Sequence, residues 1–144
     1  MTKILILGGG GMVGQKLANH LLASGLLGHK ALDITLFDMA FPLKQDGRLR
    51  CITGSLTDAQ NITMLARLRP DIVFHLASIV SGEAESNFDA GWQVNMFTMW
   101  HYLEALKALH IGSNGAYVPK IIFTSSIAVF GGPFPEQIDD TFLS

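Results

Sequence analysis

The chain is short of several residue types, and each shortage excludes a class of protein. It has one cysteine, Cys51, so it cannot form an internal disulfide, which fits a reducing compartment. Charged residues make up 15% of the 144 positions and nearly cancel to a net charge of −2, so the composition indicates neither a nucleic-acid nor a membrane partner. The five histidines are scattered without the spacing of metal ligands. We therefore expect no metal site.

Long apolar runs are also missing. The first one, which starts at Ile4, already ends in glycines at Gly8, so it lacks the form of a signal peptide. No segment reaches the roughly 20 apolar residues of a membrane-spanning helix, and we expect a cytoplasmic protein. With 49% hydrophobic residues the chain can bury one sizeable core, which predicts a single domain over residues 1–144.

The most informative stretch is Lys3–Gly14, where an apolar run breaks into four consecutive glycines and then becomes amphipathic. The run at 4–7 is short and rich in β-branched residues, which predicts a strand buried on both faces of a parallel sheet. The amphipathic part predicts a helix that ends near Ser24. The helix face that we expect to pack on the sheet comprises Val13, Leu17, Ala18, Leu21 and Leu22.

Three glycines of this stretch, Gly8, Gly11 and Gly14, have the spacing of a phosphate-binding turn. Without side chains they allow unusual dihedral angles, close approach of the backbone to a phosphate, and close packing of the helix on the strand. The helix N-terminus adds unpaired N–H groups and a partial positive charge. We therefore predict a pyrophosphate site here, with a purely structural turn as the alternative.

A second predicted strand, Leu32–Asp38, ends in a carboxylate at the distance from the glycines that is typical of dinucleotide folds. An acid at this position binds the hydroxyls of the adenosine ribose. A carboxylate accepts hydrogen bonds from both hydroxyls but repels a 2′-phosphate, and no arginine follows Asp38 directly. The sequence therefore favours NAD over NADP, the alternative being an ordinary solvated aspartate.

Predicted strands and helices alternate along the rest of the chain. Right-handed crossovers then give an α/β fold, a Rossmann-type doubly wound parallel sheet with the strand order 3-2-1-4-5. The expected segments are a loop at 39–48, a strand at 49–53, a helix from Thr57 as N-cap to Arg69, a strand at 71–78, a loop at 81–86, a helix at 88–109, a strand at 120–126 and a loop at 130–135.

Such sheets bind ligands beyond the carboxyl ends of their strands, near the switch point between the first and fourth strands. Several polar or small residues fall on that edge, and this convergence is the strongest sign of a site in the sequence. Besides the glycine turn, they are Asp38, Ser55, Ala77, Ser78, Ser125 and Ser126.

Other chemically suggestive residues have simpler interpretations. His75 lies in a buried predicted strand, where a hydrogen-bonded core histidine is favoured over a catalyst or a metal ligand. Glu83 and Glu85 lie in a polar segment, where solvated carboxylates are favoured over an acid/base pair. A row of apolar residues in the long helix is expected to be core or a surface for a partner helix, namely Trp92, Met96, Met99, Trp100 and Leu103.

Four motifs follow one another along the whole chain: Gly8-x-x-Gly11-x-x-Gly14, Phe74-His-Leu-Ala, Val94-Asn95 and Phe123-Thr-Ser-Ser-Ile-Ala-Val-Phe-Gly131. Together they resemble the extended short-chain dehydrogenase/reductase family, the NAD-dependent sugar epimerases and dehydratases. Two segments, 75–85 and 125–136, are more narrowly similar to members that oxidise a four-carbon sugar acid.

The resemblance implies roles for individual residues. The backbone at Met12 and Val13 would hold the pyrophosphate, and Asp38 the ribose. Ser55 and Leu56 would border the adenine, although the family more often has an acid at the position of Ser55. The residues on the cofactor side would also include Leu76, Ala77, Ser78, Asn95 and Ser125. Ser81 and Gly82 would lie on the substrate side. Ser126 would be the catalytic hydroxyl that orients the substrate alcohol.

The family's base is a tyrosine followed four residues later by a lysine, and this chain departs from that pattern. Tyr102 and Tyr117 are followed at that spacing by Leu106 and Ile121. We expect the pair beyond Ser144, so the sequence is interpreted as the cofactor half of an enzyme, truncated before its substrate domain.

The parent enzyme is expected to be an NAD-dependent oxidoreductase that acts on a small sugar acid and forms a homodimer when full length. The alternatives are a nucleotide-sugar epimerase or dehydratase, and a non-catalytic NAD-binding module.

Overall fold

The computed structural model describes residues 1–126, 132–134, 136–139 and 141, so the predicted loop at 130–135 lies partly outside the described residues. Five parallel strands form one sheet in the order β3-β2-β1-β4-β5, which confirms the predicted order. Their bounds are β1 Thr2–Leu7, β2 Leu32–Asp38, β3 Arg50–Thr53, β4 Ile72–His75 and β5 Lys120–Phe123.

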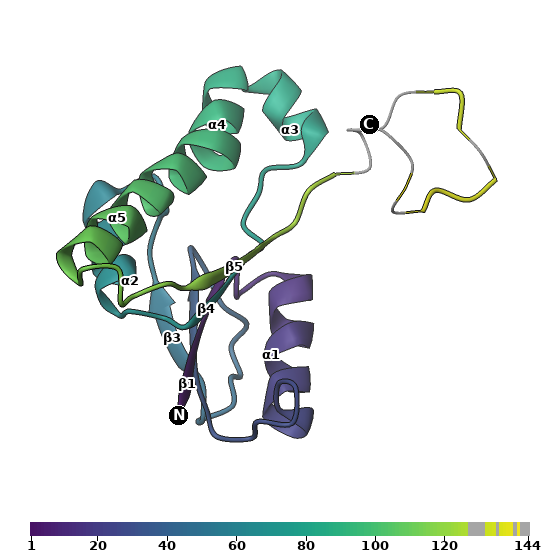
Figure 1. Cartoon of the computed structure of the whole chain (residues 1–144). Helices are drawn as coiled ribbons and strands as arrows, with labels where there is room; N and C mark the ends of the chain where they lie inside the picture. Colours follow the sequence, from purple (N-terminus) through teal and green to yellow (C-terminus); the bar gives the residue numbers. More distant parts are fainter. Residues whose placement is uncertain (127–131, 135, 140, 142–144) are drawn as a thin grey trace.

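Helices cover both faces of the sheet, which makes a three-layer α/β fold. Figure 1 shows α1 on one face and α2 and α5 on the other, with α4 beyond the ends of the strands. The helical segments are α1 Met12–Ser24, α2 Ala59–Arg67, α3 Ser81–Ser86, α4 Phe88–Trp92, the π-helix η1 Gln93–Phe97, and α5 Thr98–Gly112.

The central strand β1 shows why the sheet is buried on both sides. Its side chains alternate between two apolar clusters, because successive residues of a strand point to opposite faces. Ile4 and Ile6 pack with α1, whereas Leu5 and Leu7 pack with α2 and α5. No residue from Ile4 to Leu7 is more than 1% exposed. The apolar run at 4–7 therefore forms the doubly covered strand that it predicts.

At the amino ends of the strands, Tyr117 ties two crossovers together. Its hydroxyl donates a hydrogen bond to the carbonyl oxygen of Pro70 at 2.9 Å, and the guanidinium of Arg69 lies 4.7 Å from the centre of its ring. Burial raises the pKa of Tyr117 to about 12, so the hydroxyl remains a donor at neutral pH. The corner before β4 is thus fixed to the corner before β5.

The first turn of α1 departs from the prediction. Val13 is 55% exposed and does not pack on the sheet, because the helix begins at Met12, beside the strand ends. Further along the helix, Ala18 and Leu21 are buried and Leu17 and Leu22 are half-buried, as expected.

The bounds of α2 also differ from the prediction. The helix ends at Arg67, and its N-cap is Asp58, whose side chain accepts a hydrogen bond from the N–H of Gln60 at 2.8 Å. Thr57 was the wrong choice for the cap. Its hydroxyl instead lies 2.8 Å from that of Ser55.

Residues 81–86 form the short helix α3, not the predicted loop. Its composition is polar, so hydrophobic periodicity gives no sign of it. The helix is held by close packing on α4, where a Cβ added to Gly91 would lie only 2.9 Å from the Cβ of Ala84. Tertiary contact therefore overrides the polar composition.

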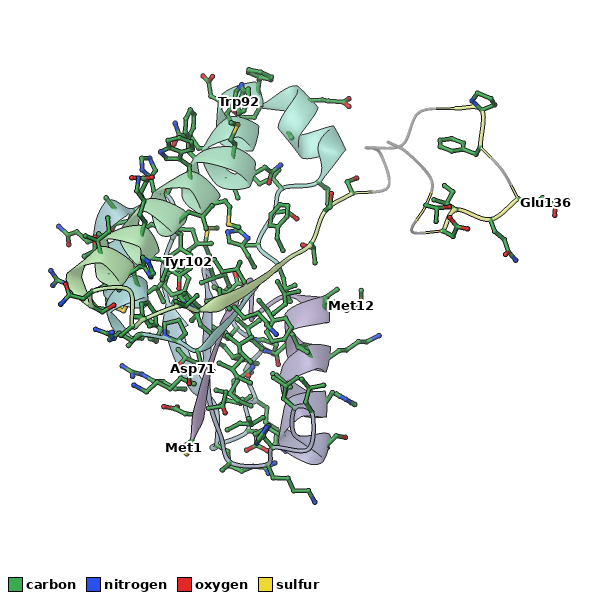
Figure 2. The ribbon with its side chains drawn as sticks, viewed as in Figure 1. Met1, Met12, Asp71, Trp92, Tyr102 and Glu136 are labelled. Atoms are coloured by element: carbon green, nitrogen blue, oxygen red, sulfur yellow. The ribbon has the colours of Figure 1, made fainter. Side chains whose placement is uncertain are left out.

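The predicted long helix consists of three consecutive segments, α4, η1 and α5, and continues to Gly112. The π-helical stretch changes which side chains face the sheet, because each of its turns holds an extra residue. Trp92, Met96, Trp100 and Leu103 are exposed, and Figure 2 shows Trp92 on the outer side of this layer. Among the described residues they are therefore not core, and the surface for a partner helix stays a prediction.

Two polar side chains, His75 and Tyr102, are buried in the layer under α5. His75 is 1% exposed and Tyr102 is fully buried, and Figure 2 shows Tyr102 between α5 and the strands. Within the described part of the chain, the two ring nitrogens of His75 have no hydrogen-bond partner, and the hydroxyl of Tyr102 has none either. The burial of His75 is confirmed, but the expected hydrogen bond is wrong: its ring instead lies 5.8 Å from that of Phe123.

We expect this burial of His75 to make stability depend on pH. Desolvation lowers the pKa of His75, whereas the unfolded chain protonates at the ordinary value of 6.5. The contribution of neutral His75 to the free energy of unfolding is therefore fully present above pH 6.5. It is lost as the pH falls below this value, by up to about 1.4 kcal/mol for each pH unit. Urea unfolding between pH 7.5 and 5.5 measures the slope.

The matched variant is His75→Leu, which is similar in volume and cannot titrate. It should lose most of this slope, because it removes the imidazole whose pKa burial lowers. An unchanged slope in the variant would assign the pH dependence to other groups.

Candidate functional site

A hollow of about 360 Å³ opens at the carboxyl edge of the sheet. Its wall comes from the turn after β1, the end of β2, the turn after β3, the loop after β4, and η1. The structure thus brings together residues that are far apart in the sequence. The predicted site residues that line it are Gly8, Gly11, Asp38, Ser55, Leu56, Leu76, Ala77 and Ser78.

The three glycines of the first turn have different roles. Gly8 has a φ of +83°, and a Cβ there would lie 2.7 Å from the backbone nitrogen of Ala77. A Cβ on Gly14 would overlap the carbonyl oxygen of Gly8, so both positions are required by the fold. A Cβ on Gly11 would meet only that same oxygen, at 3.5 Å. Gly11 therefore leaves space towards the hollow without being required for folding.

The N-terminus of α1 has the electrostatic character of an anion site. Gly11 is its N-cap, no acidic residue lies in its first turn, and no side chain among the described residues caps it. The first-turn N–H groups and the positive end of the helix dipole therefore remain available to a ligand. A pyrophosphate in the hollow beside Gly11 would be bound by both.

Asp38 connects the end of β2 to the glycine turn. Its Oδ2 accepts a hydrogen bond from the N–H of Gly10 at 2.9 Å, and its Oδ1 accepts one from the N–H of Met39 at 2.7 Å. These bonds fix the carboxylate at the wall of the hollow. Each oxygen has lone pairs left over, so the group can still accept hydrogen bonds from a ligand hydroxyl.

Asn95 fixes the loop after β4. Its Oδ1 accepts a hydrogen bond from the N–H of Ile79 at 2.7 Å, and its Nδ2 donates one to the carbonyl oxygen of the same residue at 2.9 Å. Ile79 lines the hollow together with the neighbouring Val94, whereas Asn95 does not. Asn95 therefore positions the wall of the site without forming it.

We expect Asn95→Leu to weaken NAD binding about 5- to 30-fold, because it removes two hydrogen bonds worth roughly 1–2 kcal/mol together. Calorimetric titration with NAD measures the loss. The matched control is Asn87→Ala, which removes a bond to the N–H of Ala90 at the start of α4 without touching the loop. Equal losses in the two variants would contradict a positioning role for Asn95.

Other predicted residues lie outside the wall of the hollow. Met12, Val13 and Gly14 belong to the start of α1, Ser81 and Gly82 to α3, and Ser125 and Ser126 follow β5 as exposed residues. Their roles stay predictions. The wall also contains residues that the sequence analysis did not assign to the site, namely Phe37, Met39, Gly54, Thr57, Ile79 and Val94. Each of them flanks a predicted site residue in the sequence, which is the one signal that could have found them.

No group of three or more His, Cys, Asp or Glu side chains is placed to hold a metal ion among the residues that the structure describes. In the same residues, no helix has the length and apolar character to cross a membrane.

Comparison with known proteins identifies the family. The model of the NAD dependent epimerase/dehydratase family matches residues 4–143. The chain belongs to this family. The curated relatives that it matches include D-erythronate dehydrogenase of Cupriavidus necator, 37% identical over 98% of this chain and 44% of the relative, and that of Haemophilus influenzae, 36% identical over 96% and 42%. The chain therefore spans less than half the length of these family members.

Solved structures of the epimerase/dehydratase type show the same architecture. A nucleoside-diphosphate-sugar epimerase from Agrobacterium tumefaciens is 40% identical with a TM-score of 0.83, over 98% of this chain and 42% of that one. A variant of uronate dehydrogenase from the same organism, complexed with NAD, is 26% identical with a TM-score of 0.65, over 88% and 41%. The family is thus NAD dependent, and a related fold has been observed with NAD bound.

Proposed function

We propose that this chain binds NAD across the carboxyl edge of its sheet. The adenosine half lies on the β2 and β3 side against Asp38, the pyrophosphate over the turn after β1, and the nicotinamide half beside the loop after β4. The observation that carries this proposal is the open space at Gly11. It adjoins the N-terminus of α1, which no side chain among the described residues caps, and Asp38 is fixed beside it. Membership of an NAD-dependent family supports the choice of ligand.

Calorimetric titration of the chain with NAD tests the binding. We expect one site per chain and a heat signal that disappears when the nicotinamide dinucleotide is replaced by nicotinamide alone, because most of the proposed contacts hold the adenosine and the pyrophosphate. No heat with NAD would overturn the proposal.

We further propose that the protein oxidises the alcohol of a small sugar acid such as D-erythronate. Two relatives of that activity align with nearly the whole chain, which supports this substrate class. When bound, NAD supplies the hydride acceptor. The chain's own part is to fix the dinucleotide, while Ser126 orients the substrate hydroxyl and Ser81 and Gly82 border the substrate.

The complete gene product assayed with NAD and D-erythronate tests the reaction. We expect NADH to form with D-erythronate and not with erythritol, the polyol without the carboxylate. Rapid reaction with erythritol would contradict a sugar-acid substrate, and no NADH with either would overturn the dehydrogenase proposal while leaving NAD binding intact.

A nucleotide-sugar epimerase is the second candidate. It is favoured by the 40% identity to a structure described as a nucleoside-diphosphate-sugar epimerase. Such an activity would convert a UDP-sugar without net formation of NADH. Turnover of UDP-glucose by the complete gene product, measured by separating the epimers, distinguishes this candidate from the first.

A further inference from the structure

The end of the hollow beyond Asp38 lies over β3. The N–H of Gly54, which follows β3, donates a hydrogen bond to the carbonyl oxygen of Asp38 at 2.9 Å, so the turn after β3 is fixed beside the carboxylate. A ribose held by Asp38 would therefore place its base against this turn. The wall here, which we name the base end, consists of Met39, Ser55, Leu56 and Thr57.

The base end contains no charged side chain among the described residues. Asp38 is the one acid that the described residues contribute to the wall of the hollow, and the proposed function assigns its remaining lone pairs to the ribose hydroxyls. Asp58 follows Thr57 directly in the chain, but it lies outside the wall and caps α2 through the N–H of Gln60. Among the residues that the structure describes, no carboxylate is therefore placed at the base end to accept a hydrogen bond from a base.

Two hydroxyls supply the polar groups of the base end. The Oγ of Ser55 and the Oγ1 of Thr57 lie 2.8 Å apart, and Ser55 Oγ also accepts a hydrogen bond from the N–H of Thr57 at 3.2 Å. The turn after β3 is also bound to α2, because the Nδ2 of Asn61 donates a hydrogen bond to the carbonyl oxygen of Ser55 at 2.9 Å. The hydroxyl pair is thus fixed in place. One of its two hydrogens lies between the oxygens and the other is free to rotate, and either hydroxyl can be the donor within the pair.

A rotating hydroxyl can donate or accept a hydrogen bond, whereas a carboxylate can only accept. Adenine presents an amino donor at position 6 of the purine, and hypoxanthine presents a carbonyl acceptor there. The Ser55 and Thr57 pair can satisfy either group, and the apolar side chains of Met39 and Leu56 would contact either ring. Strong rejection of an analogue requires a polar group that the analogue leaves unpaired, and none of the four side chains of the base end is of that kind.

We infer that the base end does not distinguish adenine from hypoxanthine, so that the chain binds NAD and nicotinamide hypoxanthine dinucleotide with dissociation constants within about threefold of each other. This inference rests on the proposed function, because it concerns the base of the same dinucleotide.

Calorimetric titration of the chain with both dinucleotides tests the inference, together with two variants. In Ser55→Asp the new carboxylate would accept from the amino group and repel the carbonyl, so NAD should be preferred by about tenfold, the size of one charge-assisted hydrogen bond. In the matched variant Ser55→Asn, the amide can donate or accept, and the two constants should stay within about threefold.

The outcomes separate the two proposals. Similar constants in the unaltered chain, with a preference for NAD in Ser55→Asp alone, support the inference. A tenfold or larger preference for NAD in the unaltered chain overturns it and leaves the proposed function intact. Similar constants that persist in Ser55→Asp overturn the assignment of Ser55 to the base end, and no heat with either dinucleotide overturns the proposed function and the inference with it.

Discussion

Gly11→Val is expected to reduce NAD affinity by about a hundredfold or more, equivalent to roughly 2.7 kcal/mol. The valine side chain would occupy the space through which a pyrophosphate approaches the first-turn N–H groups of α1. The fold should survive, because a Cβ at this position would meet only the carbonyl oxygen of Gly8 at 3.5 Å. Loss of the N-cap glycine costs about 1 kcal/mol, a shift of a few degrees in Tm. Calorimetry and thermal unfolding measure the two effects separately.

Two further glycine variants complete this experiment. Gly47→Val adds the same side chain in the loop between β2 and β3, where a Cβ would meet nothing within 4 Å, so both affinity and Tm should be unchanged. Gly14→Ala should lower the free energy of unfolding by several kcal/mol, because its Cβ would overlap the carbonyl oxygen of Gly8. Retained affinity in Gly11→Val would remove the pyrophosphate from this turn.

The second large effect is the choice between NAD and NADP. A 2′-phosphate placed beside Asp38 would bring like charges within about 4 Å, and two such unit charges near a protein surface repel by about 4 kcal/mol. Allowing for the partial exposure of Asp38, we expect NAD to bind at least a hundredfold more tightly than NADP. In Asp38→Asn, which keeps an oxygen for the N–H of Gly10, the preference should fall below tenfold.

The control for charge is Asp58→Ser. It removes the same charge from the same edge of the sheet while serine preserves the cap of α2, so the preference for NAD should not change. A similar fall in the preference for NAD in both variants would mean that the overall electrostatic field of the protein, and not contact with Asp38, distinguishes NAD from NADP. Binding of NADP to the unaltered chain within tenfold of NAD would contradict the assignment of Asp38 to the ribose.

The strand order and most of the hollow were predictable because they follow from local patterns. The apolar run at 4–7 and the strand ending at Asp38 each carry their own periodicity and turn residues. Parallel strands place their carboxyl ends at one edge, so Gly11, Asp38 and Ser55 had to meet there. None of these predictions needed a long-range side-chain contact.

The features that the sequence analysis missed depend on such contacts. The helix α3 depends on the packing of Ala84 against Gly91, and the position of Ile79 in the wall depends on an asparagine 16 residues later. The missing partner of His75 is of the same kind, because buried histidines usually find one and only the tertiary structure shows that this ring faces Phe123. Periodicity reports which residues are buried but not what they meet.

The Tyr117 contact has a mechanical consequence. It joins the two crossovers at the amino ends of β4 and β5. The wall of the hollow lies at the opposite ends of the strands, on loops such as the one that Asn95 binds. The contact therefore fixes these two corners to each other at the end of the sheet opposite the hollow. Because this contact lies away from the hollow, we expect amide protons near Pro70 to exchange slowly with solvent whether or not a dinucleotide is bound.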